Sequence, residues 1–310
     1  MPIAMIVHGG AGNVPPEHVE SAQAGCKEAS LVGWRILQAG GTALDAVEAA
    51  VRSLEDNPMY NAGTGASLTR DGTIELDAGM MEGHTLRVGA VAAVEFIKNP
   101  ISLARRVMAS PHVLLVGKGA QEFAQEQGIP LYEFENLLTE RQHRIWLENR
   151  AQADDESRGE PRFLRREVGS LQAREEKHGT VGAVAIDRSD TLAAATSTGG
   201  IHNKHPGRVG DSPLVGCGFY ADENAAISST GYGEDFIRLL IAKRAADFVR
   251  RGETAREAAE ATIAVLSARA TGLGGLIVVD RKGNAGFAWN SQNMAHAYMI
   301  EGMQEPTTGI

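Results

Sequence analysis

The sequence predicts an α+β fold, because strand-like and helix-like patterns alternate along the chain and several strands are joined by short turns. An apolar strand at residues 3–7 comes first and runs into a glycine-rich turn. Helical periodicity follows at residues 17–38 and 43–55. These two helices are expected to end at Gly40 and before Pro58, because glycine and proline stop a helix.

The remaining strands are expected in locally paired groups. Asp71 and Gly72 form a turn signal between short strands at residues 67–69 and 74–77, which predicts a β-hairpin. Further patterns predict strands at residues 88–96, 113–116, 181–186, 192–197, 276–279, 285–289 and 297–300, and helices at residues 102–108, 234–250 and 254–269. Two sheets between layers of helices would accommodate this order of elements.

A charged segment separates the two parts of the chain. Residues 138–177 are rich in Arg, Glu, Asp, Gln and Ala and contain few large apolar residues after Trp146. This composition predicts a mobile linker, above all from about residue 151 to residue 179. For the early part, through about Arg150, the alternative is a surface helix with interleaved charges.

The composition is that of an ordinary globular protein. The 310 residues are 43% hydrophobic and 22% charged, which allows a large core. A formal net charge of -9 and a pI near 5.5 argue against nucleic acid and anionic membranes as partners, because both call for a basic patch. No signal peptide or membrane-spanning run is recognised, so a cytoplasmic location is expected. Cys26 and Cys217 are too few for a disulfide framework or a zinc site and are expected to be buried.

The most informative stretch follows the charged segment, where Gly179 and Thr180 stand at the entrance of an apolar strand. Cleavage between them would give Thr180 a free α-amine, which can act as general base for the hydroxyl of the same residue. Such an amine has a pKa of roughly 7.7 to 8.0 and can accept a proton near neutral pH. On its own, a Gly-Thr step before a strand is weak evidence, because it is common turn chemistry.

Five other motifs change the interpretation of this step. In chain order they are HGGAG from His8, NAGTG from Asn61, TSTGG from Thr196, PGRVGDSP from Pro206 and STGYGE from Ser229. Together with the Gly-Thr step, and in this order, they closely resemble the N-terminal-nucleophile (Ntn) hydrolases of the plant-type asparaginase and isoaspartyl peptidase family. The resemblance covers nearly the whole chain and is weak only at residues 131–177.

The resemblance implies a fold, a maturation step and a reaction. The fold is an αββα four-layer sandwich. The chain would cleave itself after Gly179 into an α subunit, residues 1–179, and a β subunit, residues 180–310, which stay in one domain and pair as (αβ)2. Thr180 would then hydrolyse L-asparagine, or β-aspartyl dipeptides, through a covalent β-aspartyl ester. The partners are thus small-molecule substrates, and no catalytic cofactor is implied.

The resemblance also implies roles for single residues. Thr198 would support the Thr180 amine, while Arg208 and Asp211 would bind the α-carboxylate and the α-amine of the substrate. An arginine fork and an aspartate suit those two groups chemically. The remaining roles are Thr230 and Gly231 as an oxyanion hole that also contacts substrate, Asn61 as a further donor beside it, and Gly233 as a contact for the substrate amine.

Each of these residues also has a plainer interpretation. Thr198 suits strand packing, and Asn61 suits a turn. Arg208 and Asp211 would otherwise form a surface ion pair worth about 0 to 1 kcal/mol. Residues 230–233 also suit a phosphate-binding turn before a helix, although no P-loop lysine or full dinucleotide fingerprint accompanies them.

The resemblance further implies a structural sodium site within residues 54–64. Its ligands would be the backbone carbonyls of Leu54, Glu55, Asn57, Tyr60, Ala62 and Thr64, which leave no side-chain signature. The histidines are expected to play no catalytic part. His8 would pack near the bond to be cleaved, and His202, His205 and His296 lack metal-like spacing and are expected at the surface.

Two other functions stay open at this point. A glycosylasparaginase would share the nucleophile and the substrate anchors, although its members are typically secreted. A glycine-rich protein that binds nucleotides or phosphate without hydrolysing anything is the alternative from another class. The sequence does not rank L-asparagine against isoaspartyl dipeptides as substrates.

Overall fold

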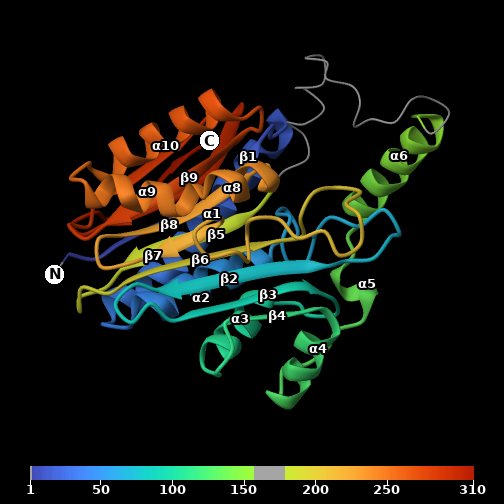
Figure 1. The fold of residues 1–310 in the computed structure, drawn as a ribbon, viewed down its shortest axis with the longest axis horizontal. Helices are drawn as coiled ribbons and strands as arrows, with labels where there is room; N and C mark the ends of the chain where they lie inside the picture. Colours follow the sequence, from blue (N-terminus) through green and yellow to red (C-terminus); the bar gives the residue numbers. More distant parts are fainter. Residues whose placement is uncertain (1, 157–178) are drawn as a thin grey trace.

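The computed structural model describes residues 2–156 and 179–310, and its elements lie in four layers (Figure 1). The strands are β1 (Ala4–Gly12), β2 (Leu76–Glu82), β3 (Val88–Val94), β4 (Leu114–Val116), β5 (Val181–Ile186), β6 (Leu192–Thr198), β7 (Phe219–Ala221), β8 (Ala225–Gly231), β9 (Gly274–Asp280), β10 (Ala285–Trp289), β11 (Asn293–Ile300) and β12 (Thr307–Gly309). The α-helices are α1 (Val19–Gln38), α2 (Ala43–Glu55), α3 (Pro100–Met108), α4 (Gly117–Glu126), α5 (Phe134–Leu137), α6 (Glu140–Glu156), α8 (Gly233–Leu239), α9 (Ile241–Arg250) and α10 (Ala255–Arg269), and a 3-10 turn precedes α1 at Pro16–His18.

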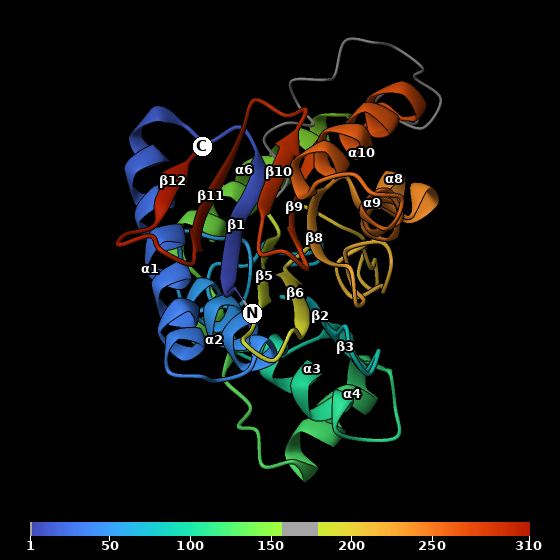
Figure 2. The same cartoon turned by 90° about the vertical axis from the view of Figure 1, so that its left-hand side faces the viewer.

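Two sheets form the central layers. The larger has the strand order β12-β11-β1-β5-β6-β2-β3-β4 and the smaller the order β10-β9-β8-β7. Helices α1 and α2 pack on β1, β5, β6 and β11 of the larger sheet, and α9 and α10 pack on β8, β9 and β10 of the smaller one. Figure 2 shows these helical layers on opposite sides of the stacked sheets. The predicted αββα sandwich is therefore confirmed.

The register of the larger sheet explains where its polar side chains point. Ser197 of β6 donates its hydroxyl to Glu55 of α2 at 2.7 Å, whereas the Thr196 hydroxyl lies 2.8 Å from that of Ser228 on β8. Because side chains alternate along a strand, Thr198 faces the second sheet as Thr196 does. Thr198 is the last residue of β6, so the side of this strand that faces the second sheet carries a hydroxyl group at its end.

Local sequence accounts for the start of two helices that pack on the sheets. Thr42 accepts a hydrogen bond from the backbone N–H of Asp45, and Thr254 forms a capping box with Glu257. Both helices bury alanine-rich faces, and small side chains let a helix lie close to a sheet.

The predicted hairpin at Asp71 and Gly72 is wrong, although the turn itself forms. The N–H of Gly72 donates to the carbonyl of Thr69, but no strand forms at residues 67–69. The N–H of Ser67 donates instead to the Asn61 side chain, and Thr69 makes an isolated bridge with Lys204. β2 therefore begins only at Leu76 and pairs with β3 and β6.

Two helices also differ from the prediction. The helix expected at residues 234–250 divides into α8 and α9 at Leu240, whose φ of 52° lies in the left-handed region. The N–H groups of Ala242 and Lys243 donate to Cys217 and Gly216, which explains the break. Helix α6 continues past Arg150 to Glu156, and the rest of the predicted linker lies outside the described residues. Among the helices that the structure describes, none is long and apolar enough to cross a membrane.

Candidate functional site

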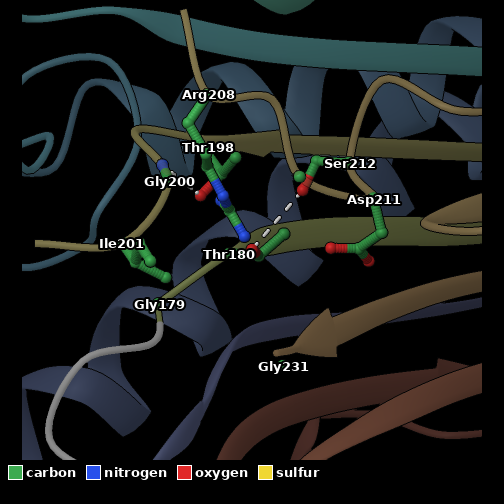
Figure 3. Close-up of a pocket in the computed structure, with 10 residues that line it drawn as sticks. Gly179, Thr180, Thr198, Gly200, Ile201, Arg208, Asp211, Ser212 and Gly231 are labelled. Atoms are coloured by element: carbon green, nitrogen blue, oxygen red, sulfur yellow. Dashed lines mark hydrogen bonds between the residues drawn. The ribbon is translucent and has the colours of Figure 1, made fainter. Parts of the chain in front are cut away.

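A small pocket lies where β5 begins and β6 ends (Figure 3). It is lined by Gly179, Thr180, Thr198, Gly200, Ile201, Arg208, Gly210, Asp211, Ser212 and Gly231. Six of the residues predicted for cleavage, catalysis or substrate binding therefore meet in one cavity, although they come from four separate motifs. The other three of that group, Asn61, Thr230 and Gly233, do not line the pocket but adjoin it, as described below.

Thr180 is at the centre of this pocket. It directly precedes β5, and Val181 pairs with Ser197, so Thr180 stands beside Thr198 at the end of β6. The Thr180 side chain is buried, and its hydroxyl oxygen lies 3.5 Å from that of Ser212. Sequence reasoning missed Ser212, although it adjoins Asp211 in a motif that was singled out. Figure 3 shows Ser212, Arg208 and Asp211 pointing toward Thr180.

Gly179 is enclosed by two segments that are distant in sequence. A Cβ built on Gly10 would lie 2.9 Å from Cα of Gly179, and a Cβ on Gly179 would lie 3.0 Å from Cβ of Asn61. Gly10 has a φ of +108°, which side chains rarely adopt. The predicted packing of the His8 motif beside the Gly179–Thr180 bond is thus present, and two glycines and Asn61 fix the space around it.

Replacement of Gly10 with alanine should slow cleavage of the Gly179–Thr180 bond at least about ten-fold. Backbone strain of about 1–3 kcal/mol at a positive φ adds to the clash with Gly179 and displaces the bond. A gel time course of the purified chain would measure the rate. Gly40→Ala is the matched control, because Gly40 has a φ of +82° but no atom within 4 Å of the added Cβ. Equal rates in both variants and the parent chain would contradict the prediction.

The two predicted substrate anchors differ in their partners. Arg208 donates from Nε and Nη2 to the carboxylate of Glu234, at 3.0 and 2.8 Å. Asp211 is buried, and its Oδ2 has no hydrogen-bond partner among the residues that the structure describes. Burial raises the pKa of the Asp211 carboxyl to about 7. An unpartnered carboxylate that lines a pocket is a ready acceptor for a ligand's ammonium group.

Because Gly233 and Gly231 have no side chains, their backbone can lie close to the Asp211 carboxylate and to the pocket wall. A Cβ on Gly233 would lie 3.0 Å from Oδ1 of Asp211, and one on Gly231 would lie 2.6 Å from the carbonyl of Leu273. Gly231 lines the pocket, whereas Thr230 accepts a hydrogen bond from the N–H of Ala11 at 3.2 Å. Thr230 thereby connects β8 with the segment that encloses Gly179.

Asn61 is fixed by hydrogen bonds at both ends of its amide. Its Nδ2 donates to the carbonyl of Gly200 at 2.6 Å, and its Oδ1 accepts from the N–H of Ser67 at 2.7 Å. The Nδ2 atom carries two protons, so one N–H group remains for a second hydrogen bond. Asn61 is therefore held in a fixed orientation beside Gly179, and one of its two bonds is the local backbone bond expected of a turn asparagine.

Burial determines whether His8 can act as a base. His8 is fully buried with Nε2 2.9 Å from the Ser228 hydroxyl, and burial lowers its pKa to about 3. It is therefore neutral at physiological pH and poorly suited to act as a base.

The expected exposure of His296 is wrong: its ring is buried against Phe287, with centroids 4.2 Å apart. His205 is exposed, and His202 is half-buried and contacts Ser67.

The predicted sodium loop closes on itself. The N–H of Thr64 donates to the carbonyl of Glu55, and that of Tyr60 donates to Asn57. The Thr64 hydroxyl is buried and has no partner among the described residues, which suits a hard cation that takes oxygen ligands. Within residues 2–156 and 179–310, no group of three His, Cys, Asp or Glu side chains forms a candidate metal site.

Comparison with known proteins places this geometry in context. The asparaginase family matches residues 1–310. The plant-type L-asparaginase of Pyrococcus horikoshii is 48% identical over 99% of this chain and 100% of its own length. The plant-type L-asparaginase of Thermococcus kodakarensis is 47% identical over 99% of both chains. The isoaspartyl peptidase/L-asparaginase of Rattus norvegicus is 43% identical over 97% of this chain and 87% of its own.

Proposed function

Because this chain belongs to the asparaginase family of Ntn hydrolases, which act without a catalytic cofactor, we propose that it cleaves itself after Gly179 and then hydrolyses L-asparagine and β-aspartyl dipeptides. One observation supports this most: a threonine hydroxyl, a guanidinium and an unpartnered carboxylate line the same pocket. The names of the relatives support the two substrate classes.

Cleavage makes Thr180 a nucleophile with its own base. In the intact chain its nitrogen belongs to the peptide bond with Gly179, so that chain is a zymogen. Cleavage frees the amine, which takes the proton as Oγ1 attacks the side-chain amide carbon of the substrate. The C–N bond breaks, ammonia or an amino acid leaves, and a β-aspartyl ester forms on Thr180. Water then releases aspartate and restores the hydroxyl.

The surrounding residues bind and orient the substrate. Arg208 would pair with the α-carboxylate and Asp211 with the α-ammonium group, with Gly233 beside it, and this places the side-chain amide next to Thr180. Thr230, Gly231 and Asn61 would stabilise the oxyanion, and Thr198 would orient the Thr180 amine. Because the substrate would be held at its α-carboxylate and at its α-ammonium group, we expect both groups to be free in every substrate.

Three further features belong to this proposal. The α subunit, residues 1–179, and the β subunit, residues 180–310, would stay together in one domain, and two such units would form an (αβ)2 heterotetramer, as the family resemblance implies. The loop at residues 54–64 would bind sodium through backbone carbonyls, and the unpartnered Thr64 hydroxyl is a further oxygen in this loop that could contact the ion. A cytoplasmic location is supported by two buried, unpaired cysteines.

Intact mass spectrometry during incubation, followed by substrate assays, tests the proposal. A fragment that begins at Thr180 and release of aspartate from L-asparagine or a β-aspartyl dipeptide are expected. Activity confined to a glycosylated asparagine would favour a glycosylasparaginase. A chain that stays whole and is stabilised by nucleotides would overturn the proposal in favour of a binding protein.

A further inference from the structure

Lys204 is a buried lysine beneath the segment that carries Arg208. Its side chain is 0% exposed, its ammonium donates to the backbone carbonyl of Glu75 at 2.9 Å, and it lies 3.8 Å from the Glu75 carboxylate. The stem packs under Gly200, where an added Cβ would lie 2.9 Å from Cδ of Lys204. A fully buried lysine is uncommon in proteins unless its charge is paired, and here the pairing group is Glu75.

Glu75 binds the same segment at a second point. Its two carboxylate oxygens accept from the N–H of Gly207 at 3.1 and 2.9 Å. Gly207 directly precedes Arg208, so the Glu75–Lys204 pair fixes both ends of the turn from Lys204 to Gly207. The next residue along the chain is the predicted carboxylate anchor.

Asp77 completes the buried charges behind the pocket. It pairs in register with Thr198, so the two side chains share the face that meets the pocket. Its Oδ1 accepts from the N–H of Ala93 at 2.8 Å, and its Oδ2 has no partner among the described residues. Burial raises the pKa of the Asp77 carboxyl, whereas the charges of Lys204 and Arg208 act to lower it. Lys204 therefore interacts electrostatically with Asp77 as well as with Glu75.

Stability alone does not explain this arrangement. Removal of two charges from water costs several kcal/mol per ion, and well-packed apolar residues often replace such a pair without loss of stability. The best-attested use of a buried ionic group is to select one arrangement of the chain.

We propose that the Glu75–Lys204 pair is a positioning unit that sets Arg208 for the α-carboxylate of the substrate. This inference rests on the proposed role of Arg208. It does not extend to Thr180, because neither Glu75 nor Lys204 lines the pocket. The pair should therefore govern recognition of the carboxylate and leave self-cleavage and the chemical step nearly unchanged.

Competition by the product L-aspartate and by two of its analogues separates the anchors. L-Aspartate carries both the α-carboxylate and the α-amine, succinate lacks the amine, and β-alanine lacks the α-carboxylate. In Lys204→Met, inhibition constants for L-aspartate and succinate should rise about ten-fold, the effect of weakening one charged hydrogen bond. The value for β-alanine should change less than about two-fold, KM for L-asparagine should rise, and kcat should stay nearly constant. Lys118→Met, in the exposed pair with Glu122, is the matched control.

Arg208→Ala separates failure of this inference from failure of the proposed function. If Arg208→Ala leaves the preference for α-carboxylates intact, the proposed role of Arg208 fails. If Arg208→Ala removes the preference but Lys204→Met does not, the positioning role is overturned. Equal losses for all three compounds, or a Lys204→Met chain that no longer cleaves itself, would also overturn it. Should Lys204→Met be insoluble, the isosteric Glu75→Gln variant is expected to show the same selective rise, and its absence there decides against the inference.

Discussion

Replacement of Thr180 with alanine should abolish both self-cleavage and hydrolysis. The change removes only the hydroxyl and one methyl group from a buried side chain whose hydroxyl lies 3.5 Å from that of Ser212, so little packing is lost. Without the hydroxyl no covalent ester can form, and loss of a nucleophile lowers kcat by about 10⁴-fold or more. Intact mass and the rate of aspartate release measure the two effects separately.

Thr180→Ser serves as the control, because serine keeps the hydroxyl and, after cleavage, the α-amine. It should retain part of both activities. A Thr180→Ala chain that still gives a fragment beginning at residue 180, or that still hydrolyses L-asparagine, would sink the mechanism whatever the serine variant does.

The second large effect is expected at Asp211, through binding of the substrate amine. Asp211→Asn removes the charge from a buried carboxylate that has an unpartnered oxygen, so affinity for β-alanine should fall about 10- to 100-fold. Affinity for succinate should change little, because succinate has no amine. In Arg208→Ala, affinity for succinate should fall and affinity for β-alanine should change little. Isothermal titration of the cleaved protein with the two analogues would measure both.

The pH dependence of the same binding follows from the raised pKa of Asp211. The ammonium group binds the ionised carboxylate, and with a pKa of about 7 that form is lost as the pH falls below 7. The affinity of the parent protein for β-alanine, divided by that of Asp211→Asn, should therefore be roughly ten-fold smaller at pH 6 than at pH 8. The division removes the contribution of the Thr180 amine, which titrates in the same range and is present in both proteins. A ratio that does not change with pH would show that Asp211 does not bind the amine.

Most of the fold was predictable because its signals are local. Periodicity and stop residues located α1 and α2, and the four-layer arrangement followed from the family resemblance. The break at Leu240 could not be predicted, because it depends on carbonyls of Gly216 and Cys217 that reach the helix only in the folded protein. The hairpin predicted at Asp71 is missing for the same reason. Thr69, in its predicted first strand, pairs instead with Lys204, which is distant in the chain.

The functional site could also be predicted only in part from the sequence. The motifs identified Thr180, Arg208 and Asp211, because charged and hydroxyl residues in glycine-rich segments indicate chemistry. Their supporting contacts are separated by many residues in the chain. Ser212 lies beside Thr180 only through folding, and Glu75 contacts a segment that is more than 120 residues away. No spacing rule predicts such pairs.

The strand order of the larger sheet has a consequence for the cleaved protein. Strands β1, β2, β3 and β4 precede Gly179, whereas β5, β6, β11 and β12 follow it, and β5 and β6 lie between β1 and β2. Neither fragment contains the sheet as a continuous unit, so we expect the chain to fold before the proposed cleavage. After the proposed cleavage, refolding would become a reaction between two molecules. The measured stability of the cleaved unit would then depend on the concentration of its two fragments.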